Sequence, residues 1–235
     1  MKRFMIIMMA VLLVTSLSVA QDVSPMVSAG SKSLNFTFGG LGAFGLGPTG
    51  IGGGLGASYF LASDAAVRIG FQIANASSTI PANPAAGQTG TDGSQSAFTV
   101  GVAGDYLMYM TGASSRVRPY VGGGVQFGTA STNRKTAVIS PAVQTEIKNS
   151  AGGETINGKT YFGGTSFGAV GIIGAEFFLY KEISLSAEYQ LTLYSSTSAA
   201  DQEVVTGGTT VTTKATSFSQ LLGFGAAGAM LHIYF

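Results

Sequence analysis

The sequence predicts an all-β chain that forms an eight-stranded antiparallel transmembrane β-barrel with up-and-down strand order. Three observations support this fold class. Apolar and polar residues alternate with period two in several segments, and the connections between these segments are alternately short and long. Only 10% of the 235 residues are charged, whereas 35 are glycine. Beyond the first twenty residues no uninterrupted apolar run is long enough for a membrane-spanning helix.

The N-terminus has the three parts of a secretory signal. Lys2 and Arg3 precede an apolar run over residues 4–14, and small residues then lead to Ala20. The run is too short to span a bilayer as a helix, and polar Gln21 follows, which disfavours an uncleaved anchor. We therefore expect a signal peptide at 1–20, a short periplasmic segment at 21–30 and a barrel domain at 31–235.

The period-two pattern defines the strands. It is clearest at 183–193, where Ile183 and Leu185 share one face and Ser184 and Glu188 share the other. The predicted strands are residues 32–42, 51–61, 66–75, 96–108, 117–127, 165–179, 183–194 and 217–235. About ten residues tilted by ~45° rise ~23 Å, close to the apolar band of an outer-membrane barrel. In the last strand Leu222 is out of phase with Leu231, which indicates a bulge or a stretch that is apolar on both faces.

The connections separate the two ends of the predicted barrel. The short ones are residues 62–65, 109–116 and 180–182, and the long ones are 43–50, 76–95, 128–164 and 195–216. Glycine, serine, threonine, asparagine and proline are abundant in the long connections, which is typical of solvated loops. Tight turns at one end and long loops at the other are the pattern of bacterial outer-membrane barrels.

The polar strand face is expected to line the barrel lumen. It carries many small residues and few charges, whereas the solvent-exposed face of a soluble sheet would carry many charges. An arginine turned toward the lipid midplane would cost ~2–4 kcal/mol. We therefore predict an inward charge network, with the alternative that some members lie solvated at a barrel end; its members are Arg68, Asp105, Arg118, Glu176 and Glu188. A lumen filled in this way should conduct little, and Arg118→Leu should lower the temperature of the heat-induced mobility shift.

Closure of the barrel places both termini at one end. Lipid offers no hydrogen bonds to an open sheet edge, so the first and last strands must pair on the short-turn side. Aromatic residues cluster toward that side and are predicted to form a girdle at the lipid–water boundary. They are Tyr59, Tyr106, Tyr109, Tyr120, Phe177, Phe178, Tyr180, Tyr234 and Phe235.

Four segments carry a family resemblance: residues 118–124, 174–178, 185–189 and 231–235. With them, residues 31–235 resemble the small outer-membrane β-barrel domain family, eight-stranded porin-like barrels of Gram-negative envelopes. The resemblance implies location in the outer membrane and contact with its lipid. It also implies that the barrel-insertion machinery recognises Leu231, Ile233 and Phe235 in the C-terminal strand, although Gly228 lies farther from the end than the family's usual glycine.

Two glycine motifs do not indicate nucleotide binding. Residues 153–160 match the phosphate-loop pattern, and residues 40–45 match the dinucleotide fingerprint. Neither motif lies between a predicted strand and a helix, which both kinds of site require. Asn157 and Gly158 are better interpreted as a turn.

The candidate acid–base residues are also given structural roles. His232 falls on the lumen face near the periplasmic end, and its alternate neighbours, Met230 and Tyr234, include no serine. Glu176 and Glu188 could form a carboxylate pair for glycoside cleavage, but a filled barrel leaves no cleft for a sugar. A histidine at the barrel mouth and a structural carboxylate pair are the favoured interpretations.

These features favour a non-enzymatic barrel of the outer membrane, and no cofactor is expected. The chain has no cysteine and one histidine, and no basic patch for nucleic acid. Its long loops are predicted to serve surface contact or envelope integrity. An extracellular ligand could bind at 76–95, 128–164 and 195–216, of which 128–164 is the longest. The alternative is a narrow pore or transport barrel for small apolar ligands, and the third possibility is a lipid-modifying enzyme.

Overall fold

The computed structural model describes residues 25, 27–37 and 54–235. The predicted signal peptide, the 43–50 loop and the adjoining parts of the first two predicted strands lie outside these residues. Regular secondary structure in the described residues consists of β-strands. Nowhere among them does a helix have the length and apolarity needed to cross a membrane.

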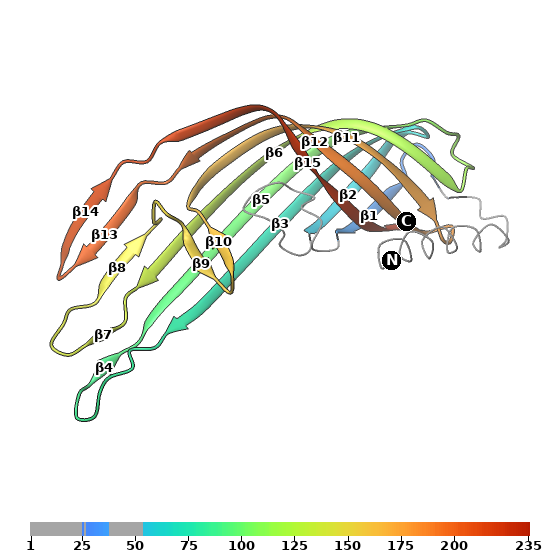
Figure 1. Cartoon of the computed structure of the whole chain (residues 1–235). Helices are drawn as coiled ribbons and strands as arrows, with labels where there is room; N and C mark the ends of the chain where they lie inside the picture. Colours follow the sequence, from blue (N-terminus) through green and yellow to red (C-terminus); the bar gives the residue numbers. More distant parts are fainter. Residues whose placement is uncertain (1–24, 26, 38–53) are drawn as a thin grey trace, which may run out of the picture.

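Eight strands form a closed antiparallel barrel, which confirms the predicted fold class (Figure 1). Each strand pairs with its neighbour in chain order, β6 pairs with β11, and the ring closes where Ser33 of the first strand pairs with Tyr234 of the last. Both chain ends of the barrel therefore lie at the end with the short turns. The barrel strands are β1 (Lys32–Thr37), β2 (Gly54–Ala62), β3 (Ala65–Ile80), β5 (Gly93–Tyr109), β6 (Val117–Lys135), β11 (Gly164–Phe178), β12 (Ile183–Ala199) and β15 (Ser217–Tyr234).

The phase change in the last strand is a bulge. Gln190 pairs with Ala226 and Thr192 pairs with Gly223, so β15 contains one residue more than β12 between these pairs. Leu222 lies next to this irregularity and has a φ of 54°, in the left-handed region. The bulge is one of the two alternatives that the sequence pattern left open, and it accounts for the change of phase.

The long connections contain more strand than predicted. β3, β5, β6 and β12 continue into residues assigned to loops at 76–95, 128–164 and 195–216. The predicted strand ends at this side of the barrel are therefore wrong, because serine and threonine on both faces also suit a strand that is exposed to water on both faces. The remaining strands are β4 (Gly90–Thr91), β7 (Val138–Ile139), β8 (Thr145–Lys148), β9 (Glu154–Ile156), β10 (Lys159–Tyr161), β13 (Gln202–Thr206) and β14 (Thr209–Thr213).

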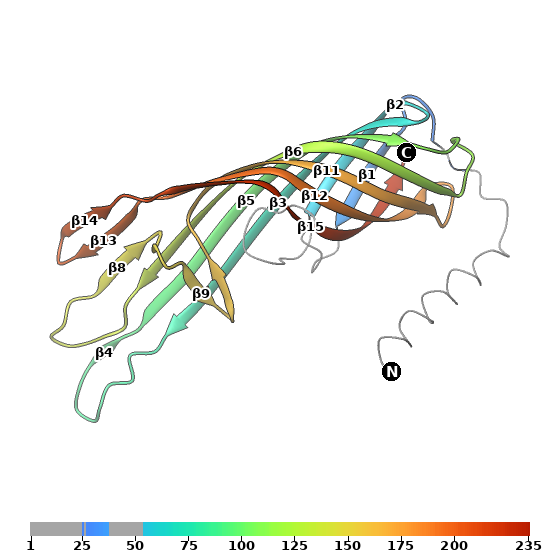
Figure 2. The same cartoon turned by 45° about the horizontal axis from the view of Figure 1, so that its top comes forward.

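These extensions form a sheet beyond the barrel, at the end far from the C-terminus (Figures 1 and 2). β8 pairs with the last residues of β6, β13 pairs with β8, and β14 pairs with β13. We call residues 74–80, 93–97 and 129–135 together with β8, β13 and β14 the projecting sheet.

The outward face of the barrel carries an apolar band with defined limits. On β5 the band runs from Phe98 to Met108, and Ser96 and Ser94 follow on the same face. About ten residue steps of ~3.4 Å tilted by ~40° rise ~25 Å, the height expected for a barrel of this kind. Toward the projecting end, the last outward apolar residues of β5, β6 and β11 are Phe98, Phe127 and Phe167, and the next outward residues toward the projecting sheet are polar.

The prediction of an aromatic girdle at the short-turn end is only partly confirmed. Tyr59, Tyr106, Tyr180 and Phe235 are exposed, and Phe177 is half-buried. The other four predicted members are buried inside the barrel, because their positions in the strands alternate with the outward ones. They are Tyr109, Tyr120, Phe178 and Tyr234.

These four rings fill the lumen near the short turns. Phe60 lies between Tyr109 and Tyr234, with ring centroids 5.4 and 6.0 Å away. Val27, which precedes β1, is buried in the same cluster. Gly30 donates its backbone hydrogen to the carbonyl of Phe60, which holds this N-terminal segment against β2.

A hairpin packs against one face of the projecting sheet. Asn157 and Gly158 both have positive φ between β9 and β10, so the predicted turn is confirmed. Ile156 and Tyr161 of this hairpin are buried against Ala97 of β5. The segment that matches the phosphate-loop pattern is therefore a β-hairpin.

Candidate functional site in the barrel lumen

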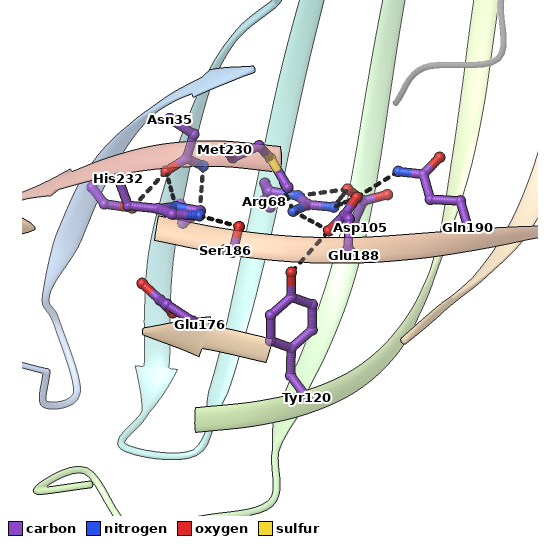
Figure 3. Close-up of polar contacts among 12 residues, drawn as sticks. Asn35, Arg68, Asp105, Tyr120, Glu176, Ser186, Glu188, Gln190, Met230 and His232 are labelled. Atoms are coloured by element: carbon purple, nitrogen blue, oxygen red, sulfur yellow. Dashed lines mark hydrogen bonds and ion pairs between the residues drawn. The ribbon is translucent and has the colours of Figure 1, made fainter. Parts of the chain in front are cut away.

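Arg68 joins opposite walls of the barrel (Figure 3). Its Nε donates to Asp105 Oδ2 of β5 at 2.8 Å. Its Nη1 and Nη2 donate to the two carboxylate oxygens of Glu188 on β12, at 2.8 and 3.1 Å. All three side chains are at most 2% exposed. This bidentate, charge-assisted arrangement fixes both carboxylates at the centre of the lumen.

Amide and phenol groups complete the shell of Glu188. Tyr120 of β6 donates its hydroxyl to Glu188 Oε2 at 3.0 Å, and Gln190 donates its amide to Oε1 at 2.7 Å. Gln126 in turn donates to Gln190 Oε1 at 2.9 Å. The network therefore links β3, β5, β6 and β12 in one layer across the barrel.

Glycines on neighbouring strands provide the space for this layer. A Cβ at Gly174 would lie 2.6 Å from the Tyr120 ring, and a Cβ at Gly124 would lie 2.0 Å from Asp105 Oδ1. Both glycines pair directly with the residue that they accommodate. The small residues of the inward face thus allow large polar side chains to lie flat across the lumen.

Glu176 belongs to a separate cluster nearer the short turns. Tyr109 donates its hydroxyl to Glu176 Oε2 at 3.0 Å, and Tyr234 and Ser184 donate theirs to Oε1. Glu176 and Glu188 therefore have different hydrogen-bond partners. Three hydroxyl donors around Glu176 offset the cost of burying its carboxylate.

The predicted ion pair of Arg118 does not form. Within the described part of the chain Arg118 is fully buried but makes no ion pair, although Glu176 is its register partner on β11. Its Nη2 donates to the backbone carbonyl of Ser63, and its guanidinium stacks over the Tyr109 ring at 4.2 Å. Because the tyrosines occupy the oxygens of Glu176, Arg118 is held by a carbonyl and by aromatic faces instead.

His232 lies in a hydrogen-bond chain that the sequence pattern did not reveal. Its Nε2 is 2.7 Å from Ser186 Oγ, and its Nδ1 is 2.8 Å from Asn35 Oδ1. Asn35 Oδ1 also accepts from Ser33, and Asn35 Nδ2 donates to Ser58. With this orientation of Asn35, His232 donates from Nδ1 and accepts the Ser186 hydroxyl hydrogen at Nε2.

The order serine, histidine, asparagine resembles a general-base chain, but its surroundings differ from those of a catalytic site. Ser186, His232 and Asn35 are each at most 4% exposed. The serine comes from β12, which pairs with β15, so inspection of alternate residues along β15 alone could not find it. Register pairing of two strands, rather than spacing within one, was the missing signal.

The C-terminal residues predicted to be recognised during insertion lie at the seam of the barrel. Leu231 pairs with Phe36 of β1, and Ile233 pairs with Leu34. Ile233 and Phe235 are exposed on the lipid-facing side. This places the predicted signal beside the strand that closes the barrel.

Comparison with known proteins gives one family and several distant structures. The family model described as Outer membrane protein beta-barrel domain matches residues 7–224. The solved structure of OprG from Pseudomonas aeruginosa is 11% identical, with a TM-score of 0.44 over 89% of this chain and 97% of that chain. A major outer membrane protein from Thermus thermophilus is 12% identical, with a TM-score of 0.45 over 88% of this chain and 100% of that chain. No curated protein sequence matches the chain.

Proposed function

Because this chain belongs to the outer membrane protein β-barrel domain family and is located in the outer membrane, we propose that it is a closed, non-enzymatic barrel that displays a β-sheet surface outside the cell. The observation that carries this proposal is the projecting sheet. It continues the barrel wall past the apolar band and adds β8, β13 and β14 to it. A sheet with polar residues on its outward face is suited to contact in water rather than in lipid.

The lumen supports an anchoring role rather than a passage. The layer around Arg68 and Glu188 spans the barrel, and the aromatic layer around Phe60 lies nearer the short turns. Ions would have to displace charge-assisted hydrogen bonds between buried groups, which is costly in a low-dielectric interior. An enzymatic role is disfavoured by the burial of the Ser186–His232 pair.

Cysteine labelling tests which end of the barrel lies outside the cell. The chain has no cysteine, so a single introduced thiol reports one position. On intact cells, a membrane-impermeant maleimide should label Thr209→Cys on the projecting sheet. It should label Lys181→Cys at a short turn only after the outer membrane is permeabilised. The reverse pattern would contradict the proposal.

Planar-bilayer recording tests the closed lumen. The purified full chain should give no steady single-channel steps in potassium chloride, because both side-chain layers obstruct the path. Steady conductance that changes with Glu188→Ala would instead support the narrow-pore alternative, and the lumen network would then be its constriction.

A further inference from the structure

The last strand of the projecting sheet leaves one edge without a strand partner among the described residues. β14 ends the sheet order, and its only pairing there is with β13. All five of its residues are exposed. Proteins usually protect such an edge with charge, proline or a bulge, and β14 has the sequence Thr-Thr-Val-Thr-Thr.

The hairpin geometry shows which backbone groups point to this edge. Gly207 and Gly208 both have positive φ, and Thr206 pairs with Thr209 across them, as in a two-residue type I′ hairpin. In that hairpin Thr209, Val211 and Thr213 direct their backbone groups toward β13. Thr210 and Thr212 therefore present their N–H and C=O groups to the open edge.

The sequence of β14 is its own complement in an antiparallel pair. With Val211 opposite Val211 of a second copy, Thr210 lies opposite Thr212, and Thr209 lies opposite Thr213. Thr210 and Thr212 are the residues with open backbone groups, so their two cross-pairs would make four hydrogen bonds around a twofold axis. We propose that β14 is a homophilic docking strand that pairs with β14 of a second copy of this chain.

Charges near the edge do not oppose this pairing. Lys214, which follows β14, donates to Asp201 Oδ2 at 2.6 Å, and the backbone of Ala215 donates to Oδ1 of the same carboxylate. The hydrogen bond from Lys214 lowers the pKa of Asp201 and raises the pKa of Lys214. Two copies would therefore meet along a strand of neutral residues bordered by an ion pair.

The symmetry of the pair determines where the second copy is anchored. The twofold axis that relates two antiparallel strands is normal to their sheet. Because the projecting sheet continues the barrel wall, the normal to this sheet at β14 is perpendicular to the barrel axis. Rotation about this axis inverts the barrel, and in both views β14 runs along the general direction of the barrel strands (Figures 1 and 2). The second copy is therefore anchored in an opposing membrane, and the contact joins two membranes.

A single pair of five-residue strands is a weak contact, because short two-stranded sheets are marginal in water. Many copies held in each of two facing membranes raise the effective concentration and act together. The interaction is thus expected between membranes and not between isolated barrels in dilute detergent.

Vesicle clustering tests the proposal with the full chain. Wild-type protein reconstituted in neutral phosphatidylcholine vesicles should cluster them, as measured by turbidity and dynamic light scattering. Val211→Lys places two ammonium groups opposite each other and should reduce clustering to the level of protein-free vesicles. Two control variants accompany this test. Val211→Thr keeps a neutral β-branched residue and should still cluster the vesicles.

Thr79→Lys adds the same charge on β3 of the projecting sheet, away from β14, and should also still cluster the vesicles. Heat-modifiable mobility of every variant verifies that the barrel is folded.

Cross-linking tests the register and the orientation. Directly opposed residues of a non-hydrogen-bonded pair lie within disulfide reach, so Val211→Cys should form dimers on mild oxidation. Mixing two vesicle populations with different tags should give dimers that carry both tags. Val204→Cys lies one strand inward, opposite Val211 in the same molecule, and should give none.

The outcomes separate this inference from the proposed function on which it rests. Absence of clustering by the wild type, clustering by Val211→Lys, or dimers confined to one vesicle population would each overturn homophilic pairing across membranes. Those results leave the display of the sheet intact if Thr209→Cys is labelled on intact cells. Failure of that labelling would overturn both.

Discussion

Inside the barrel, one guanidinium group holds two carboxylates from different strands. Arg68 makes three charge-assisted hydrogen bonds, and its removal would leave Asp105 and Glu188 buried without a counter-charge. Breaking a buried pair by removing one partner costs more than the pair contributes, because the remaining charge is not solvated.

Arg68→Met is therefore expected to destabilise the barrel by ~3–5 kcal/mol. Denaturant unfolding in lipid vesicles, followed by the loss of heat-modifiable mobility, measures the change. The control is Lys148→Met, which breaks the exposed Lys148–Glu203 ion pair on the projecting sheet and should cost at most ~1 kcal/mol. Equal effects of the two substitutions would show that Arg68 is not a structural centre.

Arg118→Met should be tolerated better than Arg68→Met. Its Nε and Nη1 are buried without a hydrogen-bond partner, so an apolar side chain of similar length removes a desolvation cost as well as the ring stacking. The same unfolding assay should give a loss at least ~1 kcal/mol smaller than for Arg68→Met. A loss as large as that for Arg68→Met would show that Arg118 does serve Glu176 as a counter-ion.

The period-two alternation predicts that side chains such as Arg68 face inward, but it does not determine which hydrogen bonds and ion pairs they form. The contacts of Glu188 depend on the space at Gly174, over which Tyr120 lies. The contacts of Arg118 depend on tyrosines that occupy the nearer carboxylate. His232 and Ser186 lie on two strands whose relative register a pattern within one strand does not contain.

At the scale of elements, the β9–β10 hairpin packs on the projecting sheet but forms a separate two-stranded sheet outside the barrel wall. Its turn requires two residues with positive φ, which asparagine and glycine adopt at low cost. The hairpin is therefore a separate unit of local stability, attached through Ile156 and Tyr161.

Gly158→Val should open this hairpin without unfolding the barrel. A β-branched residue at a φ of 77° costs ~1–3 kcal/mol, which is comparable to the local stability of a short hairpin. Proteolysis of folded protein in vesicles should become faster within residues 150–163, with an unchanged heat-shift temperature. Gly152→Val, where a side chain meets open space, should leave the proteolysis rate unchanged. Faster cleavage of both variants would point to general loosening of the loop.

The presence and the order of the barrel strands were predictable from the sequence. Lipid on one face and a packed lumen on the other require apolar and polar residues to alternate along each strand. Strand ends were not predictable at the projecting end. Beyond Ile73, β3 continues as Asn75, Ser77 and Thr79 on its outward face. Once both faces meet water, polarity no longer alternates, and the composition of a strand resembles that of a loop.

For the whole molecule, the outward face determines how deeply the barrel sits in lipid. The band between Phe98 and Met108 on β5 is bordered by polar residues on the projecting side. The sequence predicted the aromatic border near the short turns only in part. The four inward rings were included because they lie near strand ends, although their position in the alternation places them on the inner face. The exposed phenylalanines that end the apolar run of β5, β6 and β11 toward the projecting sheet were not predicted.

Val102→Lys should destabilise the barrel by ~2–4 kcal/mol, because residue 102 lies near the middle of the band. Ser94→Lys, on the same face of the same strand but outside the band, should change stability by less than ~1 kcal/mol. Unfolding in vesicles measures both. Similar costs at the two positions would mean that the lipid boundary is placed wrongly.

An apolar band ~25 Å high is shorter than the ~30 Å hydrocarbon core of an average bilayer. The bacterial outer membrane is thinner than this average, so the band fits it better than it fits a thick bilayer, where each ångström of mismatch costs a fraction of a kcal/mol. Further tilting of the strands would shorten the band and increase the mismatch, so tilting cannot adapt the barrel to a thicker bilayer. The barrel should accordingly partition into thin, short-chain lipid regions and away from thick ones, so the height of its apolar band makes its distribution sensitive to local membrane thickness.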